Sequence, residues 1–359
     1  MKLFKLFWIL LFLIGSIVPL FHMNTFEISE QEKRMLTKIP QIQKKGKLNE
    51  NYGKEFESWL GDHFGGRNRL IKTNAYIMYH IFLEMPKNSD KILGVNGEEL
   101  YLTPQMIRDL LHLNLKNDQV LRKFAESLQI IDDYLVKKNA LFFYYQCWDK
   151  HSIYPESVPN YFTPKGEFSK TDKMMEAIEL YSNIEVISPK KELIDAKRYM
   201  RTYPVTGDVS HWSQKGAYIG YLKLINKINE KSETQYQVLR EDDFIVLKEI
   251  YSKNIFLKKK NGELTQQKLT ADSFNKRHLF FTNDKVENRT RLLIIGDSYF
   301  RPVVEMLSES FYEVILVSGD SLHDLKTILD LYNADIVVIE AAERVDRVGG
   351  IIKGSERLE

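Results

Sequence analysis

The sequence predicts an α/β protein, a three-layer α/β/α sandwich around a mostly parallel sheet, preceded by an N-terminal transmembrane anchor. In the last part of the chain, continuous apolar runs alternate with stretches of helical spacing: 291–295, 302–311, 313–317, 321–332 and 335–339. Strands that alternate with helices of this length form right-handed crossovers, which give a parallel sheet covered on both faces. A further apolar run at 140–147 predicts another buried strand.

The anchor is predicted from the apolar run at 6–21, which follows Lys2 and Lys5 in the layout of a signal peptide or signal anchor. The charge bias predicts a cytoplasmic N-terminus, with the rest of the chain outside the membrane. No Ala-x-Ala-like cleavage site follows, so we interpret 1–24 as an uncleaved anchor, although the run is shorter than the usual ~20 residues. A cleaved signal peptide is the alternative. The polar segment 25–50 is predicted to be juxtamembrane.

Residues 51–350 are predicted to form the main domain. Apolar and aromatic residues at 52–83 recur every three or four positions and predict two helices interrupted at Gly65-Gly66. The stretch 91–102 predicts a hairpin, with Asn96-Gly97 in its turn. Helical spacing at 108–138 predicts one amphipathic helix before the strand at 140–147. The region 232–289 is charged and irregular, and we expect an insertion or a small β-rich excursion there.

The composition excludes several classes of function. Lys and Arg number 51 against 49 Asp and Glu, a formal net charge of +2 with no basic stripe, so nucleic acid is not an expected partner. Cys147 is the single cysteine, which excludes an internal disulfide and a multi-cysteine metal site. The eight histidines include no His-x-x-x-His pair, and the stretch 94–97 lacks the Lys-Ser/Thr ending of a phosphate loop. We therefore expect neither a metal nor a cofactor.

A candidate nucleophile follows the predicted strand 291–295. Gly296-Asp297-Ser298 comes directly after that strand, and Pro302 stands at a plausible first helical position. Ligand sites of parallel sheets collect at the carboxyl ends of the strands, and a helix N-terminus offers N–H groups to a developing oxyanion. Ser298 is thus placed for chemistry. The alternative is an ordinary Asp-Ser turn that caps a helix.

A candidate base and its partner lie in the segment before another predicted helix, whose N-cap is Ser213. Asp208 is three positions before His211. This spacing lets the carboxylate accept a hydrogen bond from one ring nitrogen while the other faces outward, which holds a base in one tautomer. Such a pair alone is more often structural. Because a serine nucleophile needs a base and the base needs an orienting group, the three residues together predict a Ser298-His211-Asp208 triad.

These motifs resemble the SGNH (GDSL-like) hydrolase superfamily, in which a Gly-Asp-Ser serine and an Asp-x-x-His pair form the triad. Here Asp208 and His211 precede Ser298, as in the permuted branch that contains the alginate-type polysaccharide O-acetyltransferases and the DHHW proteins. The N-terminal anchor also fits that branch. So do several further stretches: Asp62-His63-Phe64 with Arg67 and Arg69, Asp149-Lys150, Ile153-Tyr154-Pro155, the strand ending in Glu340, and Glu343-Arg344.

The resemblance implies an O-acetyltransferase that moves an acetyl group, through an acetyl-serine intermediate, onto a hydroxyl of a cell-envelope or secreted polysaccharide. It also implies a multispanning membrane acyltransferase as the partner that supplies acetyl groups. The expected location is the bacterial cell membrane, as a single-pass protein with its catalytic domain on the extracytoplasmic side. A carbohydrate acetylesterase with the same triad and a noncatalytic polysaccharide-binding or assembly protein are the alternatives.

Three further residues are expected to contact the substrate: Arg301, Trp212 and Tyr299. For Arg301, a surface position at the start of a helix is an equal alternative. Proteins of the permuted branch place the carboxylate two residues before the His-Trp pair, whereas Asp208 lies three before His211. Asp297 could replace Asp208 only in an unusually folded turn. The separate Gly and Gly-x-Asn-Asp oxyanion blocks of the superfamily are not found, which leaves the Ser298 backbone N–H as the one assigned donor.

Overall fold

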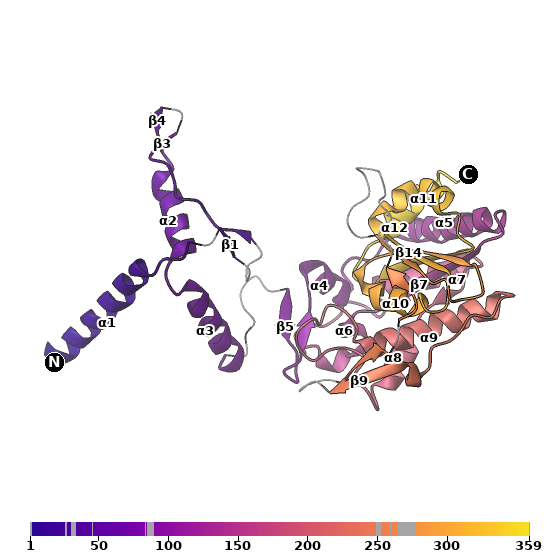
Figure 1. Cartoon of the computed structure of the whole chain (residues 1–359), viewed down its shortest axis with the longest axis horizontal. Coiled ribbons are helices and arrows are strands. Elements are labelled where there is room, and N and C mark those ends of the chain that lie inside the picture. Colours follow the sequence, from indigo (N-terminus) through magenta and orange to yellow (C-terminus); the bar gives the residue numbers. More distant parts are fainter. Residues whose placement is uncertain are drawn as a thin grey trace. The chain divides into compact units, whose positions relative to one another are not determined.

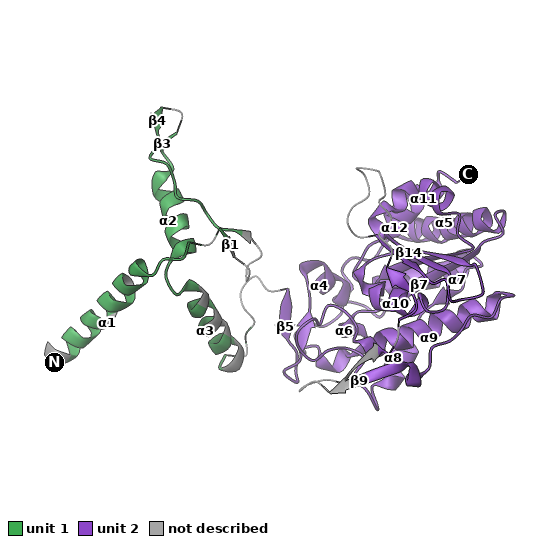
Figure 2. Ribbon diagram, in the orientation of Figure 1, with its two compact units in different colours: residues 1–89 green, residues 90–359 purple. Residues whose placement is uncertain are grey.

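The computed structural model divides the chain into two compact units, residues 1–89 and 90–359 (Figures 1 and 2). It describes residues 2–25, 27–29, 34–44, 46–82, 84, 90–248, 253–258, 260–264 and 278–358. The helices predicted at 52–83 belong to the first unit. The expected start of the main domain at residue 51 stays a prediction.

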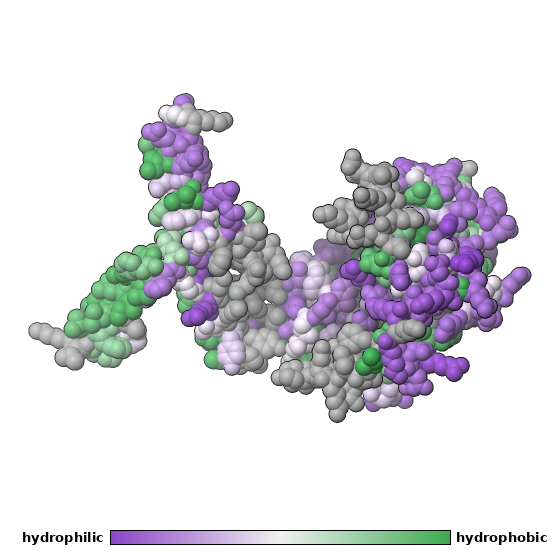
Figure 3. Space-filling view, in the orientation of Figure 1, coloured by the Kyte–Doolittle hydropathy of each residue, from purple (hydrophilic) through white to green (hydrophobic). Residues whose placement is uncertain are grey.

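The first unit begins with α1 (Lys2–Phe21), in which nearly all of the described apolar side chains are exposed (Figure 3). Its stretch Phe4–Phe21 has a mean hydropathy of 2.2, and none of this stretch is buried. Within the described residues, it is the one helix that is long and apolar enough to cross a membrane. A signal sequence has the same properties, so the helix is compatible with the anchor that the sequence predicts.

The two helices predicted at 52–83 are present. α2 (Tyr52–His63) and α3 (Arg67–His80) are separated at Gly65 and Gly66. Gly66 has a φ of +73°, which L side chains rarely adopt, and a Cβ atom on Gly65 would lie 2.3 Å from the Pro19 carbonyl oxygen. Two small hairpins complete the unit: β1 (Ile28–Ser29) with β2 (Arg34–Met35), and β3 (Gln43–Lys44) with β4 (Lys47–Leu48).

The second unit is built around a seven-stranded sheet in the order β11-β12-β14-β13-β15-β7-β8. Five neighbouring strands are parallel: β14 (Glu313–Ser318), β13 (Arg291–Gly296), β15 (Ile336–Ala342), β7 (Leu141–Cys147) and β8 (Val186–Ile187). β12 (Leu279–Thr282) and β11 (Glu263–Leu264) extend one edge in the antiparallel direction. The sheet is therefore mostly parallel, as predicted.

Alternate residues of the central strand β13 enter two separate hydrophobic cores. Leu292 and Ile294 pack in the core formed with α9 (Gln214–Lys231) and α10 (Arg301–Leu307). Leu293 and Ile295 pack in the other core. That core is formed with α5 (Asp118–Val136), α7 (Lys170–Tyr181), α11 (Leu325–Tyr332) and α12 (Val348–Ser355). Each buried Leu or Ile stabilises the fold by about 1.5–3 kcal/mol, so β13 is held from both faces. The three-layer α/β/α architecture is confirmed (Figure 1).

The hairpin predicted at 91–102 consists of β5 (Lys91–Leu93) and β6 (Glu99–Tyr101), with Gly97 at a φ of +70°. The single helix predicted at 108–138 is wrong. Two helices, α4 (Pro104–Leu110) and α5, replace it, because the Asn117 side chain accepts a hydrogen bond from Val120 N at 2.8 Å and starts a new helix.

Within 232–289, where an insertion or a small β-rich excursion was expected, two strands belong to the main sheet. β9 (Phe244–Lys248) and β10 (Lys253–Leu257) form a hairpin, while β11 and β12 join the main sheet. The remaining short elements are α6 (Lys150–Ile153), α8 (Lys190–Ala196), and the 3-10 turns η1 (Pro155–Ser157), η2 (Glu241–Asp243), η3 (Ser298–Phe300) and η4 (Gly319–Asp324). The carboxyl ends of the parallel strands lead into the candidate site.

Candidate active site

Ser298 lies at the carboxyl end of β13, in the turn η3 that leads into α10. The preceding Asp297 caps this turn, because its Oδ1 accepts a hydrogen bond from Tyr299 N at 2.8 Å. Its Oδ2 accepts from Arg347 Nη2 at 3.2 Å. Both carboxylate oxygens of Asp297 are thus engaged within the turn and with Arg347. The unusual turn that would let Asp297 replace Asp208 is not present.

The backbone of this turn is supported from the neighbouring strand β15. Glu340, whose exposed fraction is 0%, accepts a hydrogen bond from Asp297 N through Oε2 at 2.9 Å. A Cβ atom on Gly296 would lie 2.5 Å from that oxygen, so only glycine lets the carboxyl approach so closely. Burial, with repulsion from Asp297 added, raises the pKa of Glu340 to about 8.

His211 connects the two predicted motifs. It lies in the loop before α9, whose N-cap Ser213 accepts a hydrogen bond from Gly216 N at 3.2 Å, as the sequence predicts. Its Nε2 is 3.2 Å from Ser298 Oγ, and its Nδ1 is 3.0 Å from Asp208 Oδ2. The structure therefore brings Ser298, His211 and Asp208 together in the order in which a nucleophile, a base and an orienting carboxylate would act.

Asp208 remains largely exposed to solvent, with 70% of its side chain accessible, whereas His211 is at 26%. Partial burial by itself would raise the pKa of Asp208. Hydrogen bonds from Ser210 and the proximity of His211 outweigh that effect and hold the pKa below its ordinary value. The carboxylate is therefore ionised at neutral pH, as an orienting group for an imidazole must be.

Ser298 opens onto a cavity of about 450 Å³ at this end of the sheet. Arg301 lines the cavity, as expected of a substrate contact, and so do Arg344 and Arg347. Trp212 and Tyr299, which were also predicted to contact the substrate, are placed elsewhere. Trp212 is 4% exposed and Tyr299 0% exposed, their ring centroids are 4.9 Å apart, and neither lines this cavity. Their position favours packing under His211 over contact with a substrate.

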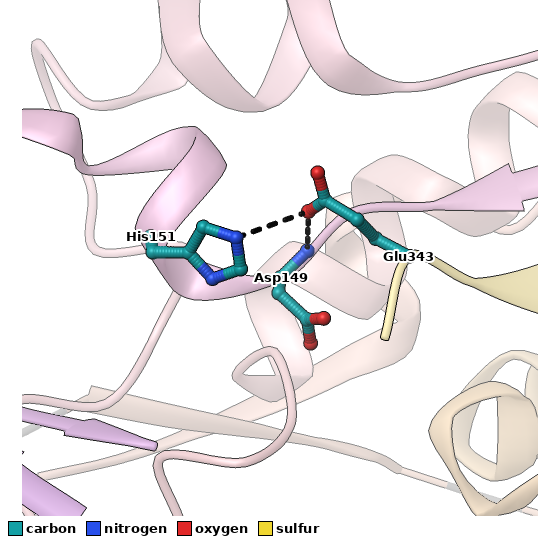
Figure 4. A group of neighbouring side chains, drawn as sticks. All are labelled: Asp149, His151 and Glu343. Atoms are coloured by element: carbon teal, nitrogen blue, oxygen red, sulfur yellow. Dashed lines mark hydrogen bonds and ion pairs between the residues drawn. The ribbon is translucent and has the colours of Figure 1, made fainter. Parts of the chain in front are cut away.

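A second group of polar side chains, Asp149, His151 and Glu343, is fully buried beside the site (Figure 4). Its composition would suit a divalent cation. However, Glu343 already accepts hydrogen bonds from Asp149 N at 3.0 Å and Ser152 Oγ at 2.7 Å, and the Asp149 carboxylate points away toward its ion pair with Arg344. These contacts indicate a structural network that fixes Arg344 at the cavity.

Arg344 is held by its ion pair with Asp149 and by two aromatic rings, those of Tyr101 and Tyr299. The side chain of Asp149, its ion-pair partner, is only 2% exposed. The Arg344 guanidinium lies 5.1 Å from the Tyr299 ring centroid. Sequence reasoning did not assign roles to Arg344, Arg347, Glu340 or Ser210. For Glu340, a signal was available: a single carboxylate within an otherwise apolar strand, 336–342, is rarely buried without a partner. The other contacts depend on loop geometry.

Several solved structures are similar to this chain. PatB1 from Bacillus cereus matches with a TM-score of 0.52 and 14% identity, over 72% of this chain and 99% of that one. A DHHW family protein from Eubacterium siraeum matches with a TM-score of 0.47 and 11% identity, over 74% and 96%. The O-acetyltransferase domain of Pseudomonas putida AlgJ matches with 0.42 and 13%, over 71% and 91%.

What this chain has in common with PatB1 is its fold. No family model matches the chain, and no curated protein matches its sequence significantly.

Proposed function

We propose that the chain is an O-acetyltransferase that uses Ser298 as nucleophile, His211 as base and Asp208 as orienting carboxylate. The observation that carries the proposal is the continuous contact from Asp208 through both nitrogens of His211 to Ser298 Oγ, at 3.0 and 3.2 Å. Distances near 3 Å are within reach of a proton transfer. The motif resemblance favours acetyl transfer among the reactions that such a triad can perform.

In the first step, Ser298 Oγ attacks the carbonyl carbon of an acetyl donor while His211 Nε2 takes the hydroxyl proton. The tetrahedral intermediate then expels the donor's leaving group, which takes that proton, and acetyl-Ser298 remains. In the second step, a sugar hydroxyl gives its proton to Nε2 and attacks the acetyl carbon, and Ser298 Oγ leaves with the proton. The Ser298 backbone N–H is a donor for the oxyanion, worth a few kcal/mol.

The acceptor we propose is a hydroxyl of a cell-envelope or secreted polysaccharide. The chain would act on the extracytoplasmic side of a bacterial cell membrane, attached through α1 as a single-pass anchor. A multispanning membrane acyltransferase would supply the acetyl groups. The apolar surface of α1 and the motif resemblance support these assignments.

The test uses the full chain in detergent with an activated acetyl ester. Ser298→Ala should lower acetate release by roughly 1,000-fold or more, because no other group replaces the nucleophile. Ser232→Ala is the control, because the Ser232 hydroxyl accepts a hydrogen bond from the backbone N–H of Thr234 and does not line the cavity beside Ser298. Equal acetate release by Ser298→Ala and the wild type would refute the catalytic proposal.

The same preparation separates transfer from hydrolysis. Polysaccharide oligomers are added with the acetyl donor, and the products are analysed by mass spectrometry. Acetylated sugar is expected, in amounts that depend on Ser298. Acetate alone at every oligomer concentration would identify an esterase, and oligomer binding without turnover would identify a noncatalytic binding protein.

A further inference from the structure

Ser210, which stands between Asp208 and His211 in the sequence, contacts both of them. Its Oγ donates a hydrogen bond to Asp208 Oδ1 at 2.6 Å and lies 3.0 Å from His211 Nδ1. Its backbone N also donates to Asp208 Oδ1, at 3.3 Å. The exposed carboxylate is therefore tied to the residue next to the histidine by two hydrogen bonds, which restrict its rotation.

The loop that carries these residues is fixed on its other side. Val209, between Asp208 and Ser210, is 1% exposed. The Gly207 N–H donates to Glu99 Oε2 of β6 at 3.2 Å. Because the backbone is anchored at both points, the side chains of Asp208 and Ser210 keep their positions relative to His211.

The Ser210 hydroxyl has a single proton, and the group to which it is donated determines which ring nitrogen of neutral His211 carries a proton. An ionised carboxylate only accepts hydrogen bonds, so the single proton of the Ser210 hydroxyl is used toward Asp208. The hydroxyl then has only lone pairs to offer His211 Nδ1, and the neighbouring Asp208 oxygens likewise only accept. All three oxygens around Nδ1 therefore favour a proton on that nitrogen, and Nε2 is left as an acceptor toward Ser298.

We propose that Ser210 is a positioning residue, which holds Asp208 and fixes the proton of His211 on Nδ1 so that Nε2 can accept the proton of Ser298. The proposal rests on the proposed function for its effect on the rate. It also explains how a carboxylate three positions before the histidine, and mostly in solvent, can orient it. The Ser210 hydroxyl contacts both the Asp208 carboxylate and the His211 ring, and so links two residues that are three positions apart.

The kinetic test compares Ser210→Ala, Ser210→Thr and the control Ser232→Ala in the full chain. At metal-bound histidines, removing the hydrogen-bond partner of the second ring nitrogen typically costs about 10- to 100-fold in affinity or activity, and Ser210 stands in the same relation to His211. We expect a loss of that size in kcat for Ser210→Ala, with KM unchanged because Ser210 does not line the cavity beside Ser298. Ser210→Thr keeps the hydroxyl and should recover most of the rate. A rise in KM with kcat unchanged would contradict the proposal.

The second test observes the tautomer directly, by nitrogen NMR of isotope-labelled histidine at a pH where the ring is neutral. His211→Gln identifies the signals of His211 by their loss. The wild type should show a proton mainly on Nδ1, and Ser210→Ala should show a mixture of both tautomers. A wild-type ring protonated mainly on Nε2, or an unchanged ring in Ser210→Ala, would overturn the proposal. This outcome does not depend on activity, so it is distinct from a failure of Ser298→Ala to lower acetate release.

Discussion

Glu340 Oε2 accepts a hydrogen bond from the backbone N–H of Asp297 at 2.9 Å, and thereby joins strand β15 to the turn that carries Ser298. Glu340 is completely buried, and besides Asp297 N its carboxyl group interacts with the buried thiol of Cys147, which is a weak donor. A charged carboxylate in that position would be costly. The raised pKa of Glu340 follows from this burial, so the side chain is mostly protonated at neutral pH.

This protonation makes the stability of the fold depend on pH. The pKa of Glu340 rises from its ordinary 4.5 to about 8 on folding, first because of burial and then because of repulsion from Asp297. Between these values the folded chain binds more protons than the unfolded chain, so the free energy of unfolding falls as the pH rises. Glu340→Gln, which has no charge to develop, should remove this part of the decline. Chemical denaturation at several pH values between 4.5 and 8 measures both slopes.

Glu340→Ala is the control for the hydrogen bond. It removes the titrating group as well, but it leaves a cavity and an unpaired Asp297 N–H, so it should be less stable than Glu340→Gln by about 2–5 kcal/mol at every pH. Glu340→Gln keeps an acceptor oxygen and should cost less. If the wild type and Glu340→Gln lose stability in parallel as the pH rises, the assigned pKa of Glu340 is wrong.

Two glycines provide a matched pair for the packing around Arg347. A Cβ atom on Gly319 would lie 2.2 Å from Arg347 Cζ, whereas a Cβ atom on Gly349 would have no neighbour within 4 Å. Gly319→Ala should therefore displace the guanidinium that bonds Asp297, with a loss of about 1–3 kcal/mol and a lower rate of acetate release. Gly349→Ala, inside α12, should raise stability by about 0.5–1 kcal/mol. Thermal unfolding distinguishes them, and equal behaviour of the two variants would contradict the close approach at Gly319.

The parts of the fold that the sequence predicted are those with a long periodic signal. The strands β13, β14, β15 and β7 are continuous apolar runs, because both of their faces are buried. β8 has two residues and is too short for any period to show. β12 lies in a charged region and joins the sheet only through pairing with β14, a contact that no local pattern encodes. The break between α4 and α5 had a signal, since Asn117-Asp118 is a typical helix start.

The residues of the site likewise divide into those that a local sequence pattern predicted and those that it did not. Ser298, His211 and Asp208 are in short motifs, and the structure brings them together. Trp212 and Tyr299, which were expected to bind substrate, adjoin those motifs, but adjacency in sequence does not determine which way a side chain faces. Trp212 instead packs against Tyr299. Its ring also lies so close to Gly220 that a Cβ atom at that position would be 2.6 Å from it. Glu340 and Arg347 reach the Ser298 turn from distant segments, so the groups that they meet there follow from the tertiary structure and not from a local pattern.

The buried pair Asp149–Arg344 should be far more important for stability than an exposed pair of similar geometry. Asp149 is 2% exposed and Arg344 16%, whereas Arg122 and Glu126 on α5 are 62% and 46% exposed at a distance of 2.7 Å. Breaking a buried pair leaves an uncompensated charge, so Asp149→Asn should cost about 3–5 kcal/mol. Glu126→Gln should cost at most about 0.5 kcal/mol, because solvent screens that pair. Chemical denaturation measures both losses.

A double-mutant cycle then separates the ion pair from other effects of the Asp149 substitution. Arg344→Met removes the charge but keeps much of the apolar length that packs on Tyr299. If the charge left by Asp149→Asn is what destabilises the fold, the double variant should lose less stability than the sum of the two single variants. Strictly additive losses, or an Asp149→Asn variant as stable as Glu126→Gln, would show that the buried network does not hold Arg344 at the cavity through its charge.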